Sequence, residues 1–214
     1  MTFSDKFFAK HSKYEAEEFF HEVLRDLGPV SGYHGYLEDR FDAYDSKNYH
    51  LSTHNGNWLG TGLYFFQDAP LYARGWAKFL ARKSITSEKK RLQFRVIKAS
   101  VNLDSCLCFC GKPAQSFFLR IRRMYDSFLN KMGWSIENQE AYHYLDNSIV
   151  ETICQLASDL GFEVKSVRGA FPSGKDLSYT GLLKDMTHIQ FTLRAGCFNL
   201  IKDIEKIDED FFSY

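Results

Sequence analysis

Two adjacent residues near the start of the chain could bind a nucleotide. His34 and Gly35 lie in residues 30–36, a short apolar and aromatic run that predicts a strand. An imidazole held at a strand end can donate a hydrogen bond to a ribose hydroxyl. Glycine has no Cβ, so its backbone can approach a flat amide closely. A purely structural role is the alternative, and the choice between the two depends on partners elsewhere in the chain.

A second segment, residues 58–66, has the sequence Trp-Leu-Gly-Thr-Gly-Leu-Tyr-Phe-Phe. Its two glycines allow close backbone packing on one side of a strand, which leaves the Tyr64 ring to face a cleft on the other. A planar ring such as nicotinamide would stack on that tyrosine face. In the helix expected to follow, Tyr72 and Trp76 lie one turn apart and could form a second wall. A core strand and helix without a ligand is the alternative.

The third segment, residues 187–194, predicts another strand. Apolar residues alternate there with His188, Gln190 and Thr192, so these three side chains share one face. That face could be exposed to solvent. It could equally be the wall of a cleft in which Gln190 reaches a ribose hydroxyl.

Together the three segments resemble the ADP-ribosyltransferases, most closely the branch of the poly(ADP-ribose) polymerases and diphtheria toxin, whose triad is His, Tyr and Glu. The resemblance covers roughly residues 30–202, and it rests on the order of the segments and their spacing. It implies NAD as substrate and a catalytic triad of His34, Tyr64 and Gln190. By the same resemblance His34 binds a ribose, Gly35 holds the carboxamide through its backbone, and Tyr64 stacks on the nicotinamide ring.

Position 190 departs from the family pattern, because the chain has Gln190 where the family has a glutamate. A glutamate orients the ribose 2′-hydroxyl and offsets the charge of an oxocarbenium-like transition state, whereas an amide oxygen does only the first. The expected activity is therefore slow and limited to single transfers, or it borrows a base from the acceptor. Because His188 replaces the first residue of the Gln/Glu-x-Glu pair of arginine-modifying members, arginine is a poor candidate acceptor.

The resemblance implies a mono-ADP-ribosyltransferase that modifies a macromolecule. Small single-domain members in bacteria are often toxins, restrained by an antitoxin protein or used in defence against phage, so such a role and partner are expected here. RNA or another nucleic acid is slightly favoured over a protein acceptor. Two alternatives stay open. One is a catalytically silent module that binds NAD or ADP-ribose, and the other is an RNA-processing relative that removes a 2′-phosphate with NAD.

The preference for nucleic acid comes partly from charge. The chain is neutral, with 27 basic and 27 acidic residues, but residues 82–131 hold 12 basic and three acidic residues, a local net charge of +9. A basic face of this kind can bind a polyanion, and reversal of Lys89, Lys90 and Arg91 to Glu would test it. A solvated helix and strand surface is the alternative.

A loop before the third segment, residues 167–175, is interrupted by glycine and proline. By the resemblance this region faces the acceptor, so Arg168 and Lys175 would contact substrate. A plain surface loop is the alternative.

These residues require a scaffold of helices and strands, and the expected fold is α+β: one domain over residues 1–214, with split mixed or antiparallel sheets flanked by helices. Helices are expected at 4–27, 68–83, 113–132 and 145–160, and strands at 30–36, 61–66, 92–103, 162–167, 187–194 and 198–204. Asp68 is expected to cap the second helix, residues 38–60 to form a loop, and residues 202–210 to fray.

Composition excludes several other classes of protein. No run approaches the roughly 18 apolar residues of a membrane span, and no secretory signal is evident, so a cytoplasmic protein is expected. Five cysteines, an odd number, argue against a disulfide scaffold. Cys106, Cys108 and Cys110 alternate, which would place their thiols on one side of an extended segment. No second cysteine pair of the kind found in zinc sites follows them, so no metal is expected.

Overall fold

The structure, a computed structural model, describes residues 13–41, 47–54, 56–84, 92–138, 143–171 and 187–212. Its strands form one open sheet in the order β1-β5-β6-β7-β3-β2-β4-β8. They are β1 (Leu24–Arg25), β2 (Pro29–Leu37), β3 (Leu63–Gln67), β4 (Phe94–Asn102), β5 (Cys106–Cys108), β6 (Ser166–Phe171), β7 (His188–Leu193) and β8 (Ile201–Ile207). The β5–β6 pair is parallel and the other neighbouring pairs are antiparallel. The expected α+β class is confirmed.

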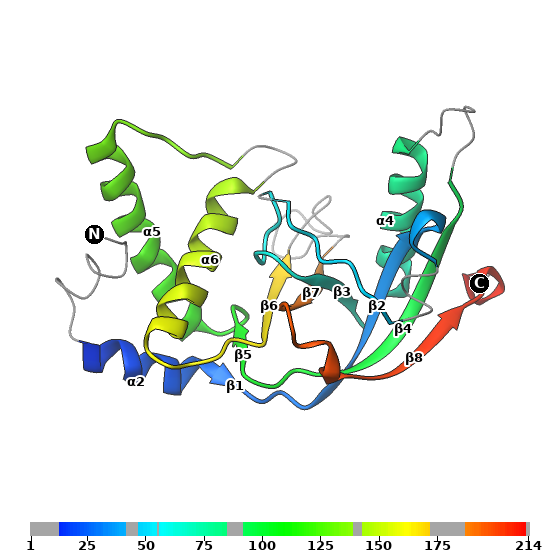
Figure 1. Cartoon of the computed structure of the whole chain (residues 1–214), viewed down its shortest axis with the longest axis horizontal. Helices are drawn as coiled ribbons and strands as arrows, with labels where there is room; N and C mark the ends of the chain where they lie inside the picture. Colours follow the sequence, from blue (N-terminus) through cyan, green and yellow to red (C-terminus); the bar gives the residue numbers. More distant parts are fainter. Residues whose placement is uncertain are drawn as a thin grey trace, which may run out of the picture.

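Four α-helices belong to the described residues: α2 (Lys13–Val23), α4 (Pro70–Lys83), α5 (Lys112–Met132) and α6 (Tyr144–Asp159). Short 3-10 turns occur at η1 (Glu38–Arg40), η2 (Phe198–Leu200) and η3 (Glu209–Phe212). Figure 1 shows α2, α5 and α6 gathered at one end of the molecule and α4 at the other. The connection from β5 to its parallel neighbour β6 contains α5 and α6, because parallel strands need a long crossover.

The two faces of the sheet carry separate hydrophobic cores. Along β3, the Phe65 side chain points to one face and the Tyr64 side chain to the other, as strand geometry requires. The face that Tyr64 shares with Tyr33 packs against α4, α5 and α6, and we call it the helix face. The face of Phe65 packs against the segments around Tyr49 and Leu200, and we call it the loop face.

In the middle of the sheet the pairing between β2 and β3 is short, with two residue pairs, Gly32 with Gln67 and Tyr33 with Phe66. By comparison, β2 pairs with β4 along all nine of its residues. Glycine permits this approach, since a Cβ at Gly32 would lie 2.6 Å from the Phe191 ring. The sequence predicts split sheets, and the structure corrects this. The strands β1-β5-β6-β7-β3 and β2-β4-β8 are joined into one sheet at this β2–β3 junction.

Two helix boundaries also differ from the prediction. Asp68 is not the N-cap of α4, which begins at Pro70 with Ala69 as its N-cap; Asp68 instead has a φ of 51° in the turn after β3. The helix predicted at 4–27 ends at Val23, because the next two residues pair with β5 as β1. Residues 4–12 of that prediction lie outside the described residues.

Two strands lie further along the chain than predicted. Phe162 is the predicted start of β6, but it lies just after the end of α6. Its ring packs on Phe20 of α2, and its N–H donates to the Ala157 carbonyl at 2.9 Å. Of residues 202–210, predicted to fray, 202–207 belong to β8, which begins only after the η2 turn. Charged side chains suit β8 because it is an edge strand, where they discourage pairing with other chains.

Candidate functional site

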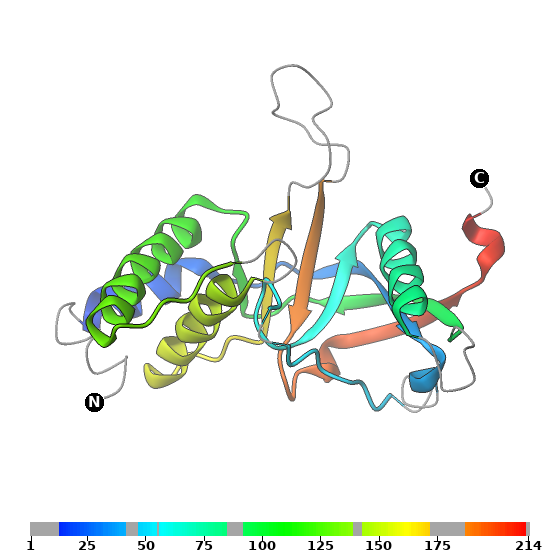
Figure 2. The same cartoon turned by 90° about the horizontal axis from the view of Figure 1, so that it is seen from above.

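The three segments singled out in the sequence lie on the neighbouring central strands β2, β3 and β7. His34 is on β2, Tyr64 on β3 and Gln190 on β7. In the β3–β7 register Tyr64 is opposite Thr192 and Phe66 is opposite Gln190, so Tyr64 and Gln190 are diagonal neighbours on the helix face. The sheet therefore unites three distant parts of the chain, and Figure 2 shows β7 and β3 between the helices at its two ends.

His34 lies at the β2–β3 junction. Its half-buried ring is on the loop face, with the ring centres of Tyr36 and Phe65 5.9 and 5.8 Å away. Its Nδ1 lies 2.7 Å from the Tyr64 carbonyl oxygen. Because a carbonyl only accepts, Nδ1 carries the proton and donates. This bond ties β2 to β3 where their backbone pairing ends.

The charge state of His34 follows from this environment. Burial lowers the pKa of His34 to about 4; the hydrogen bond to Tyr64 opposes that effect, and the charge of Arg40 adds to it. The ring is therefore neutral near pH 7, and its Nε2 is an acceptor. The sequence predicts a His34 that donates to a ribose hydroxyl. In this tautomer Nδ1 donates to the backbone, and Nε2 can only accept from a hydroxyl.

Tyr64 uses its hydroxyl to hold the loop before its own strand. The hydroxyl donates to the Gly60 carbonyl at 2.8 Å and accepts from the Leu59 N–H at 2.9 Å. Burial raises the pKa of Tyr64, which keeps the hydroxyl protonated. The half-buried ring packs against the core under α6 on the helix face. Sequence reasoning assigned a role to the ring alone and missed the hydroxyl.

An ion pair fixes the same loop to α6 and to the end of β7. Arg194 donates to both carboxylate oxygens of Glu151, at 2.7 and 2.8 Å, and to the Thr61 carbonyl at 3.0 Å. The Thr61 N–H donates to Glu151 at 2.5 Å. These bonds to the carboxylate lower the pKa of Glu151 although its burial acts to raise it. Residues 59–64 are thus held rigidly beside the candidate site.

Gln190 belongs to a polar and aromatic cluster on the helix face. Its amide nitrogen lies 2.7 Å from Nε2 of His188. The His188 ring stacks on Tyr72 of α4 at 4.6 Å and lies 5.3 Å from Phe66 and 6.0 Å from Phe171. All except Phe171 are half-buried rather than sealed in the core. The cluster offers flat ring faces beside an amide, which suits a planar ligand.

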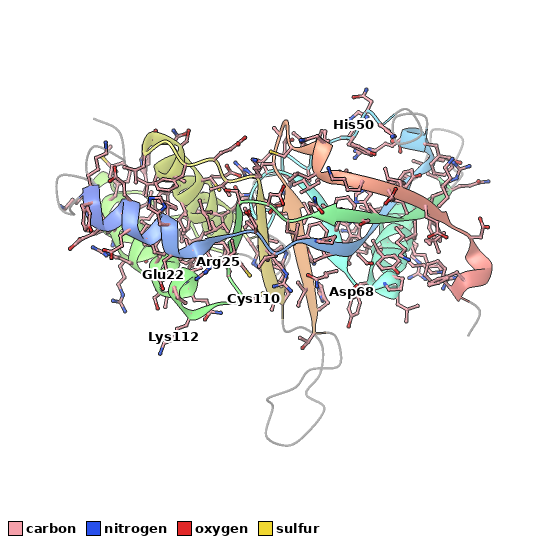
Figure 3. The ribbon with its side chains drawn as sticks, turned by 90° about the horizontal axis from the view of Figure 1, so that it is seen from below. Glu22, Arg25, His50, Asp68, Cys110 and Lys112 are labelled. Atoms are coloured by element: carbon pink, nitrogen blue, oxygen red, sulfur yellow. The ribbon has the colours of Figure 1, made fainter. Side chains whose placement is uncertain are left out.

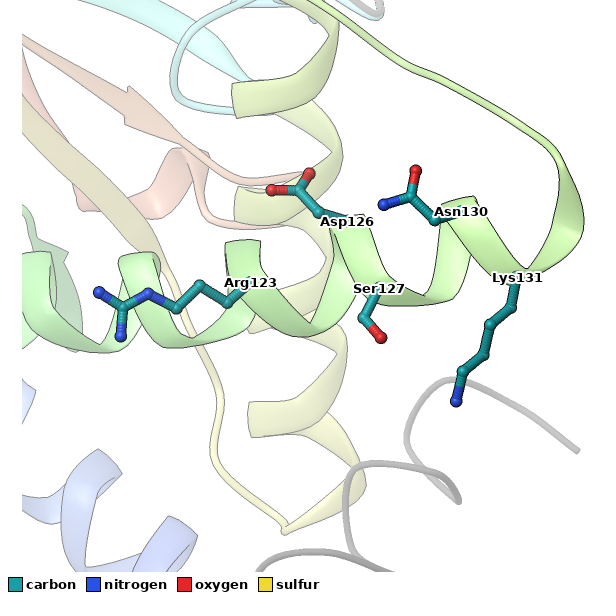
Figure 4. Close-up of a pocket in the computed structure, with 5 residues that line it drawn as sticks. All are labelled: Arg123, Asp126, Ser127, Asn130 and Lys131. Atoms are coloured by element: carbon teal, nitrogen blue, oxygen red, sulfur yellow. The ribbon is translucent and has the colours of Figure 1, made fainter.

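A pocket of about 300 Å³ adjoins this cluster. Its lining includes Gly169 and Phe171 of β6, and Gly169 pairs directly with Gln190. Ala170 of β6 also lines it. The remaining lining residues are mostly apolar and come from the 58–59 loop, the β5–α5 turn, α5 and α6: Trp58, Leu59, Phe109, Gln115, Phe118, Leu119, Asp146 and Val150. A larger hollow of about 560 Å³ lies on the surface of α5 between Arg123 and Lys131 (Figure 4). It contains none of the residues singled out in the sequence.

Of the residues that the structure describes, the others predicted for the site lie outside the aromatic cluster around Gln190. Gly35 lies beneath α4, and a Cβ there would collide with the Ala73 carbonyl, so the Gly35 Cα supports helix packing on this face. Trp76 is 48% exposed and stacks on Phe79 rather than on the cluster. Arg168 lies on β6 with its side chain bonded to Gln67 and Cys108, and Lys175 is outside the described residues.

The basic residues of 82–131 do not share one surface in the part of the chain that the structure describes. Arg82 and Lys83 end α4, whereas α5 carries five basic residues and one acidic residue. Figure 1 shows these two helices at opposite ends of the molecule. Lys89, Lys90 and Arg91 lie outside the described residues. A single basic face over the whole segment is therefore wrong, and α5 is its largest continuous part.

No model of a known protein family matches the sequence, and no curated protein matches it. Among the described residues, no three His, Cys, Asp or Glu side chains are grouped so as to hold a metal ion. The described helices also include none with the length and apolar character needed to cross a membrane.

Proposed function

We propose that this protein is an NAD-dependent mono-ADP-ribosyltransferase. The observation that carries the proposal is that His34, Tyr64 and Gln190 come from distant parts of the sequence and lie on three neighbouring strands. The Tyr64 and Gln190 side chains share the helix face, and the His34 ring is on the loop face. The half-buried aromatic cluster beside Gln190 supports it, because NAD presents two flat rings.

In this proposal the nicotinamide ring stacks on Tyr64 beside the aromatic wall that includes Tyr72, and Trp76 lies one turn further along α4. The Gln190 amide oxygen accepts from the ribose 2′-hydroxyl, and neutral His34 accepts from a second hydroxyl where β2 and β3 diverge. The bond between C1′ and the nicotinamide nitrogen breaks, and its electrons leave with nicotinamide. The acceptor nucleophile then attacks C1′ and gives up its proton. Gln190 supplies no negative charge, so we expect slow, single transfers.

For the acceptor we propose nucleic acid ahead of protein. The basic helix α5 contributes Gln115, Phe118 and Leu119 to the pocket beside Gln190. Phosphates would meet the basic side chains, and an unstacked base would meet the aromatic lining. Reversal of Arg122 and Arg123 to Glu should therefore impair transfer to RNA most strongly at low salt, where the charges are least screened, and leave NAD cleavage intact.

The matched control for this acceptor test is the same charge reversal at Arg82 and Lys83, at the far end of the molecule. If both reversals leave transfer to RNA unchanged at low and high salt, a protein acceptor is favoured.

The second candidate function is a catalytically silent module that binds NAD or ADP-ribose, and one observation favours it. The Gln190 amide is already bonded to His188, and the His34 ring is on the opposite face of the sheet from the Tyr64 ring. Such an arrangement could hold NAD or ADP-ribose without cleaving it. This candidate predicts NAD binding without release of nicotinamide.

The test of the proposal is labelling. The protein is incubated with NAD labelled in its ADP-ribose part and a bacterial lysate, and the products are digested separately with protease and ribonuclease. Label that enters macromolecules and is released by ribonuclease supports an RNA acceptor; release by protease supports a protein acceptor. Expression in bacteria provides a parallel assay for the toxin role, in which wild type should slow growth and the Tyr64→Ala variant should not. Absence of macromolecular label would contradict the transferase.

A further inference from the structure

The turn between β5 and α5 brings two thiols together at the edge of the loop face. Cys106 is fully buried, Cys108 half-buried and Cys110 exposed, and Cys110 is labelled in Figure 3. The Gly111 N–H donates to the Cys108 carbonyl at 3.4 Å, which closes a turn with Cys110 inside it. In this turn the Cys110 thiol is within hydrogen-bonding reach of the Cys108 sulfur. Cys110 is therefore open to solvent, and Cys108 is partly so.

A guanidinium group is held against one of these thiols. Arg168 is the register partner of Cys108 on β6, and its Nη1 donates to the Cys108 Sγ at 3.4 Å. Its Nε donates to the Gln67 side-chain oxygen at 2.8 Å, which fixes the direction of the group. An adjacent fixed cation stabilises a thiolate over a thiol, and arginine remains charged throughout the accessible pH range.

The three cysteines therefore differ in pKa. The Cys110 hydrogen bond and then the bonds and charge of Arg168 lower the pKa of Cys108 to about 5, although its burial opposes them. The hydrogen bond that it shares with Cys108 raises the pKa of Cys110, so Cys110 keeps its proton. Burial raises the pKa of Cys106 to about 12. The segment thus combines one ionised sulfur, one neighbouring thiol and one inert thiol.

We propose that Cys108 is a nucleophilic thiolate which hydrogen peroxide oxidises and which Cys110 then captures as a disulfide. The Cys108 thiolate attacks one peroxide oxygen, the O–O bond breaks, and hydroxide leaves while the sulfur becomes a sulfenic acid. The Cys110 sulfur then attacks the Cys108 sulfur. Water leaves with the sulfenic oxygen and the Cys110 proton. Across the two steps the thiols give one electron pair to peroxide, and one S–S bond replaces the two S–H bonds. This site is separate from the proposed transfer of ADP-ribose and does not depend on it.

The first test is alkylation of the intact protein by iodoacetamide at pH 6.5, followed by peptide mass spectrometry. An ordinary thiol is about 1% ionised at this pH and Cys108 almost wholly, so Cys108 should react at least about tenfold faster than Cys110. The Arg168→Met variant should lose part of that difference, and the Arg168→Lys variant should lose less because the charge remains. Equal rates for Cys108 and Cys110 in wild type would overturn the proposal.

The second test follows the products of peroxide treatment. Wild type should lose two hydrogens and form a Cys108–Cys110 disulfide that a reductant reverses. The Cys110→Ser variant should stop at a sulfenic acid on Cys108 that dimedone traps, and the Cys108→Ser variant should do neither. Circular dichroism of each variant checks that it is folded. If peroxide leaves both thiols of folded wild type unchanged, or attacks Cys110 first, the proposal is wrong.

Discussion

Replacement of Tyr64 by Phe separates the two roles that its side chain could have. The ring, which sequence reasoning assigned to nicotinamide stacking, is retained, and only the hydroxyl is lost. That hydroxyl donates to the Gly60 carbonyl and accepts from the Leu59 N–H. The change therefore tests whether the loop before β3 depends on the hydroxyl.

The expected cost follows from these two bonds. Each hydrogen bond contributes about 1 kcal/mol net, and an unsatisfied buried N–H costs about 1–3 kcal/mol. Leu59 is only 3% exposed, so water cannot easily replace the lost acceptor. Glu151 and Arg194 still hold the other end of the loop at Thr61, which limits the damage. We expect the free energy of unfolding to fall by about 2–3 kcal/mol.

Urea unfolding followed by circular dichroism measures this change. The matched control is Tyr14→Phe, because Tyr14 is 71% exposed and the same hydroxyl loss there should cost less than about 0.5 kcal/mol. NAD affinity, measured by calorimetry in folded samples, should fall less for Tyr64→Phe than for Tyr64→Ala, where a stacking face worth about 1–3 kcal/mol is removed. If Tyr64→Phe unfolds at the same urea concentration as the control, the structural role assigned to the hydroxyl is refuted.

Three further predictions concern the residues around the site. The folded-state pKa of His34 is about 4 and its usual value 6.5, so wild type should lose up to about 3 kcal/mol of stability as the pH falls from 6.5 to 4. Urea titrations at several pH values should show this slope in wild type and not in His34→Gln; parallel curves would contradict the assignment. Gly35→Ala should destabilise by about 1–3 kcal/mol through overpacking under α4, whereas Gly75→Ala on the open side of that helix should stabilise slightly. Equal melting temperatures for the two glycine variants would refute this packing. Arg194→Met should cost about 2 kcal/mol by leaving the half-buried Glu151 carboxylate without its cation, and a melting temperature equal to that of wild type would show that the pair contributes nothing.

The sequence predicted most of the elements because their signals are local. The 3.6-residue pattern and the glycine stop gave α6 nearly to the residue, and alternation gave β4 and β7. The short strands β1 and β5 were missed because two or three residues carry no period. The position of β6 was missed because Phe162 is apolar for a different reason, its packing on Phe20. The pairing of β2 with β3 at Gly32, which joins the strands into one sheet, was also missed, because no local sequence pattern indicates a pairing between distant segments.

For the candidate site, the sequence predicted which segments would meet but not how. The expected sharing of a strand face by His188 and Gln190 is confirmed, since strand alternation fixes it. The face on which the His34 ring lies could not be predicted, because that depends on where β2 and β3 separate. Pairs such as Arg168 with Cys108 were also missed, since their partners are far apart in the sequence. Alternation of the three cysteines was the only available hint of that pair.

The central claim, that the protein cleaves NAD at this site, is tested most directly by nicotinamide release. Purified wild type, Gln190→Ala and Gln190→Glu are incubated with NAD, and free nicotinamide is measured over time at equal folded protein. We predict slow release by wild type, release about 10²–10³-fold slower by Gln190→Ala, and faster hydrolysis by Gln190→Glu, because the glutamate restores the negative charge beside the oxocarbenium-like state. Equal release by all three proteins, or NAD binding without any release, would contradict the claim.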